Sequence, residues 1–216
     1  LSRKAQELGA DALLQVTPYY NKASQEGLVR HFTQVADHVS IPILLYNVPS
    51  RTGVTIQPET YRILSEHPNI RGTKEASGNL SLIARTAALC GQGFDIYSGN
   101  DDQTVPIMSL GGKGVVSVLA NIMPKETHKM CRLYLDGDVK ESRRMQLQLL
   151  EIMEALFWDV NPIPVKTALG LMGVCGDDLR LPLTPMEPEQ RERLAEVMKR
   201  QGISLKKELH NQTNLL

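Results

Sequence analysis

Hydrophobic and polar positions follow two alternating patterns over the first 120 residues. Short apolar runs predict strands at residues 11–17, 43–48, 70–76, 94–98 and 115–119. Between them, apolar residues spaced three and four apart predict helices at 24–39, 58–66 and 80–90, and Asp101 or Asp102 is suited to cap a further short helix. Strands that alternate with helices form a parallel sheet through right-handed crossovers. The predicted fold class is therefore α/β.

The strand pattern stops after residue 121. Four helices are predicted at 125–135, 139–158, 163–174 and 188–201, and the apolar stripe of the second is explained by core packing. No Gly-x-Gly-x-x-Gly or P-loop motif follows any strand, which favours a barrel over a doubly wound nucleotide-binding fold. We expect a partial (β/α) barrel domain at 1–124, a helical extension at 125–203 and a flexible tail at 204–216.

The strand at residues 70–76 carries one lysine. Side chains alternate along a strand, so Lys74 shares its face with Gly72 and Ala76, whereas Glu75 points to the other face. After this strand, Asn79 is suited to cap the helix that begins at Leu80. A lysine in such a buried strand is either a neutral amine kept for Schiff-base chemistry or a structural lysine held by an acid or reaching solvent. The strand alone leaves both interpretations open.

Composition narrows the class of partner. Lysine plus arginine equals aspartate plus glutamate at 24 each, so no excess charge recruits nucleic acid or lipid, and a small molecule is the expected partner. Cys90, Cys131 and Cys175 lie far apart, which argues against a zinc site or a disulfide framework and fits a reducing cytosol. No apolar run reaches the 18 or so residues of a membrane span. The chain starts without methionine, which is a first sign of a fragment.

Candidate chemistry lies where the predicted strands end, because parallel barrels place their sites at the carboxyl ends of the strands. The segments there are Thr17–Lys22, Tyr46–Gly53, Lys74, Ser98–Asp101 and Ser117–Asn121. A phenol near an amine and a carbonyl can move protons, and an arginine can bind a carboxylate through two hydrogen bonds. Taken one at a time, each residue also has an ordinary explanation as packing or as a solvated side chain.

Three of these segments together resemble a known family. Thr17–Lys22, Tyr46–Gly53 and Gly72–Gly78 resemble signatures of the dihydrodipicolinate synthase family of class I pyruvate aldolases, which also contains N-acetylneuraminate lyase. The resemblance extends from Leu8 to about Gly202. It implies a TIM (β/α)8 barrel with a C-terminal helical extension. No metal and no organic cofactor are implied.

The resemblance also implies a reaction. Pyruvate would condense with L-aspartate 4-semialdehyde through a lysine Schiff base, giving 4-hydroxy-tetrahydrodipicolinate in the diaminopimelate route of lysine biosynthesis. Such an enzyme is a carbon–carbon lyase, and the resemblance implies a cytoplasmic homotetramer built as a dimer of dimers. Neither nucleic acid nor membrane is an expected partner.

Six residues receive roles by the same resemblance. Lys74 would form the imine with pyruvate, and Tyr46 would relay protons at the imine carbon and the pyruvate carboxylate. Tyr20 would reach across a dimer interface into the neighbouring subunit's site. Arg51 would bind the carboxylate of aspartate semialdehyde. Two further residues would line the pocket through backbone groups, Gly99 and Val116.

One departure from the family pattern stands out. The family's Gly-Thr-Thr-Gly-Glu loop, whose threonines bind the pyruvate carboxylate, is absent from the sequence, and only five of eight barrel strands are predicted. The chain is therefore expected to be the C-terminal portion of a longer enzyme, and the 216 residues alone are not expected to form a stable active monomer. Of the family's lysine feedback site only Tyr19 has a matching position, which leaves feedback inhibition open.

Two alternatives remain at this stage. One is a related pyruvate aldolase or an enzyme like N-acetylneuraminate lyase, although Arg51 suits a short amino-acid aldehyde better than a sugar. The other is a non-catalytic domain or inactive fragment that binds a keto acid or only assembles. The joint presence of Lys74, Tyr46, Tyr20 and Arg51 favours an enzyme, because packing alone does not call for all four residue types at strand ends.

Overall fold

The computed structural model describes residues 1–206, so most of the tail expected at 204–216 lies outside the described residues. The chain divides into two compact units. The first comprises Leu1–Ser117 with Cys131–Arg143, and the second comprises Val118–Met130 with the residues from Arg144 onward. No helix within residues 1–206 is both long enough and apolar enough to cross a membrane.

The first unit is built on five parallel strands. They lie in the order in which they occur along the chain: β1 (Leu13–Val16), β2 (Ile43–Asn47), β3 (Ile70–Glu75), β4 (Asp95–Ser98) and β5 (Gly114–Val115). The number of strands and their parallel pairing confirm the prediction from the hydrophobic pattern. Sequential order without interruption is what repeated strand–helix units produce, and it brings the carboxyl ends of all five strands to one edge.

Helices fill the connections between these strands. They are α1 (Ser2–Glu7), α2 (Gln25–Ala36), α3 (Pro49–Thr52), α4 (Pro58–Ser65), α5 (Leu80–Cys90) and α6 (Thr104–Ser109), with the 3₁₀ turns η1 (Gly91–Gly93) and η2 (Asp101–Gln103). The Asn79 side chain accepts a hydrogen bond of 3.0 Å from the Leu82 amide, which confirms the predicted cap of α5. Pro58 opens α4, where its missing N–H costs nothing.

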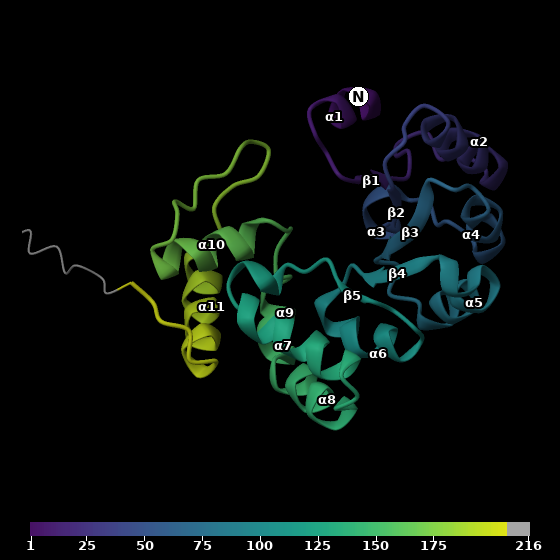
Figure 1. Ribbon diagram of the computed structural model, residues 1–216. Helices are drawn as coiled ribbons and strands as arrows, with labels where there is room; N and C mark the ends of the chain where they lie inside the picture. Colours follow the sequence, from purple (N-terminus) through teal and green to yellow (C-terminus); the bar gives the residue numbers. More distant parts are fainter. Residues whose placement is uncertain (207–216) are drawn as a thin grey trace, which may run out of the picture. The chain divides into compact units, whose positions relative to one another are not determined.

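The two faces of the sheet differ in burial. On one face the fully buried side chains of Ile43 and Leu45 pack with Phe32 and Leu64 from the helices in a single core. Each such side chain contributes about 1.5–3 kcal/mol when it is fully buried. Figure 1 shows α2, α4 and α5 along this side of the sheet. The other face carries side chains that are half-buried or exposed: Leu14, Val16, Leu44, Tyr46, Lys74 and Tyr97.

The strand predicted at 115–119 is wrong in extent. Only Gly114 and Val115 pair with β4, and a 3₁₀ turn, η3 (Leu119–Asn121), begins where the strand was expected to end. Val118 has helical backbone angles, φ −86° and ψ −42°, so the chain turns away from the ladder before the fully buried Leu119. The apolar run therefore reflects burial of a turn and not a continuous strand.

The predicted cap at Asp101 or Asp102 is also wrong. Asn100 holds the capping position of η2, and Asp101 lies inside the turn, 2% exposed. The Ser98 hydroxyl organises this turn, because it accepts from the Asn100 amide at 3.2 Å and donates to the Asn100 carbonyl at 2.7 Å. Because Ser98 makes the hydrogen bonds of this turn, the Asp101 carboxylate does not serve as its cap.

The remainder of the chain is helical, as predicted. The helices are α7 (Pro124–Leu135), α8 (Val139–Gln148), α9 (Leu150–Ala155), α10 (Ile163–Met172) and α11 (Pro188–Arg200). The single helix predicted at 139–158 is divided at Leu149, whose ψ of −1° lies far from the helical value. The predicted apolar stripe is nevertheless buried throughout: Met145, Leu149, Ile152, Met153 and Leu156.

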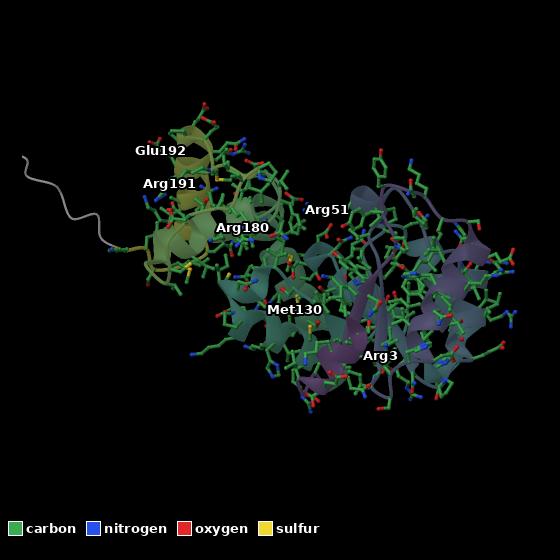
Figure 2. All side chains as sticks on the ribbon, turned by 90° about the horizontal axis from the view of Figure 1, so that it is seen from above. Arg3, Arg51, Met130, Arg180, Arg191 and Glu192 are labelled. Carbon is green, nitrogen blue, oxygen red and sulfur yellow. The ribbon has the colours of Figure 1, made fainter. Side chains whose placement is uncertain are left out.

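Residues of α11 form ion pairs within the second unit. Figure 2 labels Arg191 and Glu192 on α11, and Arg191 lies 3.8 Å from the Asp177 carboxylate. Another residue of α11, Arg200, lies 2.6 Å from the Glu151 carboxylate of α9. Both pairs are partly exposed, and exposed ion pairs contribute only about 0–1 kcal/mol each. Burial of the apolar stripe is thus the main source of stability here.

Candidate active site

Lys74 and Tyr46 face each other across neighbouring strands. They are register partners on β3 and β2, and the Lys74 Nζ atom lies 4.3 Å from the centroid of the Tyr46 ring. Both side chains are half-buried and belong to the sheet face that the helices leave uncovered. The pair stands next to the carboxyl ends of its strands, which is where the sequence placed the candidate chemistry.

Burial lowers the pKa of the Lys74 amine below its ordinary value, and the charge of Asp101 opposes this shift without cancelling it. A lowered pKa increases the fraction of neutral amine, the form that attacks a carbonyl.

Tyr46 titrates in the opposite direction. Burial raises the pKa of its phenol above the ordinary value, and the nearby charge of Arg51 lowers it by a smaller amount. The phenol thus keeps its proton at neutral pH and can donate it. Arg51, labelled in Figure 2, belongs to α3, the short helix that begins two residues after β2 ends. Arg51 is an exposed residue, as the binding of a second substrate requires.

Gly99 leaves space for the Lys74 side chain because it has no Cβ atom. A Cβ atom at this position would lie 3.1 Å from Lys74 Cε and 2.8 Å from the Ala76 Cβ. The Gly99 amide donates to the Glu75 carbonyl at 2.8 Å, so the backbone itself is fixed beside β3. Val116, one strand further, donates its amide to the Ser98 carbonyl at 2.8 Å and is 38% exposed. Both residues stand directly after a strand, although Val116 was predicted inside the strand at 115–119.

Tyr20 lies apart from these residues. Its side chain is 91% exposed, and its φ of 66° is unusual for a residue other than glycine. In the loop that follows, the Lys22 side chain lies beside α3, because its Cε would lie 2.8 Å from a Cβ at Gly53, the left-handed residue that ends this helix. Within one chain Tyr20 is therefore not packed into the site, whereas Lys74, Tyr46, Arg51 and Gly99 are brought together.

Two residues near Lys74 received no role in the chemistry from the sequence. Asp101 was predicted as a possible helix cap and as the last residue of the candidate segment Ser98–Asp101, but its action on Lys74 was not predicted, although it is the carboxylate whose charge acts on that amine. Tyr97 was not considered, although it is the register partner of Lys74 on β4. Counting two positions back from Gly99, a predicted pocket residue, would have placed Tyr97 on the face that carries the candidate chemistry. No local signal marks Asp101 as buried.

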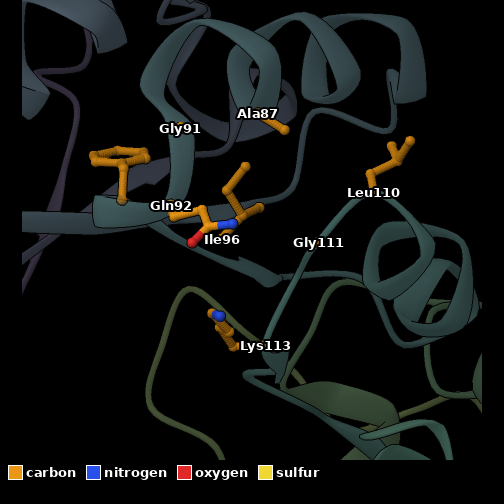
Figure 3. A pocket seen from close by; sticks show the side chains of 8 residues that line it. Ala87, Gly91, Gln92, Ile96, Leu110, Gly111 and Lys113 are labelled. Atoms are coloured by element: carbon orange, nitrogen blue, oxygen red, sulfur yellow. The ribbon is translucent and has the colours of Figure 1, made fainter. Parts of the chain in front are cut away.

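A pocket of about 440 Å³ lies elsewhere, near the amino-terminal ends of β4 and β5. Figure 3 shows it bounded by the end of α5, the start of β4 and the segment from Leu110 to Lys113. Neither Lys74 nor any other predicted site residue lines it. Within residues 1–206, no group of three His, Cys, Asp or Glu side chains is placed to hold a metal ion.

Comparison with known proteins gives consistent matches over nearly the whole chain. The 4-hydroxy-tetrahydrodipicolinate synthase of Caldicellulosiruptor bescii is 56% identical over 206 residues, which cover 95% of this chain and 70% of the relative. Dihydrodipicolinate synthase from Aquifex aeolicus matches in structure with a TM-score of 0.91 at 45% identity, covering 94% of this chain and 69% of that one. The pyruvate complex of the Acinetobacter baumannii synthase matches with a TM-score of 0.91 at 40% identity, covering 94% and 70%. A monomeric synthase variant is also among the structural matches.

These matches confirm the predicted fold class, five strands of a larger barrel with a helical extension, and the predicted enzyme class. The chain spans about 70% of the length of the curated relatives that it matches. A sequence model described as the Dihydrodipicolinate synthetase family matches residues 1–201. The chain therefore belongs to the dihydrodipicolinate synthetase family.

Proposed function

We propose that Lys74 forms a Schiff base with pyruvate and that the enzyme condenses it with L-aspartate 4-semialdehyde to give 4-hydroxy-tetrahydrodipicolinate. The observation that carries the proposal is the Lys74 amine on the Tyr46 ring, with a pKa that burial holds below its ordinary value. A half-buried amine of this kind is poised for nucleophilic attack on a keto group.

The chemistry can be written in four steps. The neutral Lys74 amine attacks the C2 keto carbon of pyruvate, and loss of water leaves an imine. Loss of a C3 proton converts the imine to an enamine. The enamine carbon then attacks the aldehyde carbon of the second substrate, which forms the new carbon–carbon bond and restores an imine on Lys74. The amino group of the second substrate attacks this imine carbon, which closes the ring and displaces the Lys74 amine. Each step moves a proton, and general acid–base groups accelerate such transfers by about 10²–10⁴-fold.

Neighbouring residues suit these steps. The Tyr46 phenol keeps its proton at neutral pH, and its ring centroid lies 4.3 Å from the reacting nitrogen, which supports a role as the proton relay. Arg51 offers an exposed guanidinium for the carboxylate of aspartate semialdehyde, a contact that can be bidentate. Gly99 and Val116 would line the substrate site at the strand ends through their backbone groups. We assign the activity to the cytoplasm, where the three free cysteines stay reduced.

Tyr20 points to an assembly. A phenol that is 91% exposed on a left-handed loop residue is not used within its own chain, and we propose that it completes the site of a neighbouring copy in a homo-oligomer. Sedimentation velocity of the wild type and of Tyr20→Asp tests this assignment. Dissociation of an oligomer by the variant is expected, and a wild type that is monomeric yet fully active would contradict it.

Borohydride trapping tests the proposed function directly. Incubation of the purified protein with pyruvate and borohydride should add one reduced pyruvyl unit to the peptide that contains Lys74. Lys74→Ala should abolish the adduct. The matched control is Lys113→Ala, which removes a lysine from the pocket at the opposite strand ends and should leave trapping unchanged. Adduct on another lysine, or an adduct that survives Lys74→Ala, would overturn the assignment.

A further inference from the structure

A buried polar network lies directly behind the Lys74–Tyr46 pair. Asn47 and Glu75 follow Tyr46 and Lys74 by one residue on the same two strands, and they too are register partners. Asn47 Nδ2 donates to both Glu75 carboxylate oxygens, at 3.0 and 3.1 Å. Asn47 is 0% exposed and Glu75 1%. Because side chains alternate, this acid–amide pair occupies the helix-covered face while the reactive pair occupies the other.

The network extends to four separate segments. Tyr61 of α4 donates its hydroxyl to Glu75 Oε2 at 3.0 Å and is hydrogen-bonded to the Thr73 hydroxyl at 3.1 Å. The Ser77 amide donates to Glu75 Oε1 at 2.9 Å, which ties the turn after β3 to the carboxylate. In addition, the Ile56 amide, in the segment before α4, donates to Asn47 Oδ1 at 3.0 Å.

The Asn47 amide, the Tyr61 hydroxyl and the Ser77 amide all donate hydrogen bonds to the Glu75 carboxylate. Burial raises the pKa of this carboxyl, whereas the bonds from Ser77, Asn47 and Tyr61 lower it by smaller amounts. Asp101 is the carboxylate whose charge raises the pKa of Lys74. The hydrogen bonds of Glu75, in contrast, fix the geometry of the strand ends.

We propose that Glu75, together with Asn47, positions Lys74 and Tyr46 for imine formation. The pair fastens β2 to β3 one residue beyond the reactive side chains and holds the turn that follows. This fixes the 4.3 Å contact between the amine and the ring from behind. The inference rests on the proposed function, because it concerns the rate of the same imine step.

Loss of the network has a defined consequence. Without the carboxylate, the Ser77 amide, the Tyr61 hydroxyl and the Asn47 amide each lose an acceptor inside the core, and the strand ends relax to find others. A relaxation of about 1 Å at a reacting group can cost up to about 10²-fold in rate. Lys74 would keep its pKa but lose its position. The rate of trapping should therefore fall while its pH midpoint stays the same.

The experiment compares the initial rate of borohydride trapping at saturating pyruvate, over a range of pH, in four proteins. They are the wild type, Glu75→Leu, Glu75→Gln and Thr86→Val. Leucine removes every hydrogen bond at similar volume, whereas glutamine removes only the charge and one acceptor. Thr86→Val is the matched control, because it deletes a buried hydroxyl of α5 that bonds only the Leu82 carbonyl, at 2.9 Å.

We expect Glu75→Leu to lower the trapping rate about 10- to 100-fold. Glu75→Gln should stay within about threefold of the wild type, the equivalent of one weakened neutral hydrogen bond. The pH midpoint should be the same in all four proteins, and Thr86→Val should trap like the wild type. Since Glu75→Leu can fail to fold, Tyr61→Phe is a second variant that deletes one donor to the carboxylate and should lower the rate about threefold.

The outcomes separate the two proposals. No trapping by the wild type overturns the proposed function and the positioning role with it. Trapping by a folded Glu75→Leu or by Tyr61→Phe at the rate of Thr86→Val overturns the positioning role alone. A pH midpoint displaced in Glu75→Gln also overturns it, because Glu75 would then act through its charge.

Discussion

The Lys74 amine lies over the face of the Tyr46 ring, 4.3 Å from its centroid. An aromatic face attracts a cation, so the contact suits the protonated amine before reaction and the protonated imine after it. Burial pulls the other way and lowers the pKa of the amine. The contact with the Tyr46 ring thus favours the charged amine and holds Lys74 in place. Burial favours the neutral amine, which is the form that reacts.

The pH dependence of trapping should report this environment. Only the neutral amine attacks pyruvate, so the trapping rate should rise with pH to a midpoint below about 10.4, the ordinary lysine value. The Asp101 carboxylate raises the pKa of Lys74, so Asp101→Asn should move the midpoint to lower pH. Asp102→Asn, at the exposed neighbouring position, should leave it in place. A midpoint that rises in Asp101→Asn would contradict the assignment.

Arg51 should govern the second substrate more than the first. Arg51→Ala removes a charge-assisted contact of about 1.5–3 kcal/mol. The KM for aspartate semialdehyde should therefore rise roughly 10- to 100-fold, while the KM for pyruvate changes little. Arg85→Ala removes an exposed arginine paired with Glu59 and serves as the control. Equal effects on both substrates would identify a structural arginine, and a preference for sugar aldehydes would favour lyase activity.

Gly99 should tolerate no side chain. The added Cβ of Gly99→Ala would lie 2.8 Å from the Ala76 Cβ and 3.1 Å from Lys74 Cε, so the lysine must shift. We expect the trapping rate to fall by about tenfold or more. Gly93→Ala is the matched control, because a Cβ at Gly93 meets nothing within 4 Å. Normal trapping by Gly99→Ala would show that Lys74 has more freedom than its surroundings indicate.

The Glu75 carboxyl should leave a signature in stability. Its folded-state pKa is raised above 4.5, so between 4.5 and the raised value the folded protein binds more protons than the unfolded chain. Stability then falls as pH rises through this window, and the loss is complete above the folded-state pKa. Urea unfolding should be measured for the wild type and Glu75→Gln at several pH values. As pH rises through this window, the wild type should lose unfolding free energy relative to Glu75→Gln. The opposite slope would mean a lowered pKa.

Local features of the fold were predictable from the sequence. Gly72, Lys74 and Ala76 on one face, and Glu75 on the other, followed from strand alternation, and the Asn79 cap followed from its position before an apolar helix. The end of β5 was not predictable, because Val118 leaves the ladder to bury Leu119 in contacts that are not local. Apolar runs report burial, and burial alone does not distinguish a strand from a buried turn.

The polar network around Glu75 could not be predicted from the sequence for a related reason. Asn47 and Glu75 are separated by 28 positions, and Tyr61 approaches Glu75 from a different helix. Each looks unremarkable in the sequence, and only the register of β2 against β3 brings them together. Asp101 was misread for the same reason, since a carboxylate that follows a strand usually caps a helix, and here Ser98 already organises the turn.

The placement of two unlike pairs on opposite faces of neighbouring strands also bears on how the chain avoids misfolding. If β3 slipped by one residue against β2, Lys74 would turn into the apolar core and Glu75 would leave its donors. Burying an unpaired charge costs several kcal/mol, a large part of a domain's net stability. The misaligned sheet is therefore heavily penalised. Chains that reach a stable fold will therefore carry Lys74 on the sheet face that the helices leave uncovered, so the requirement for stability also places the reactive lysine.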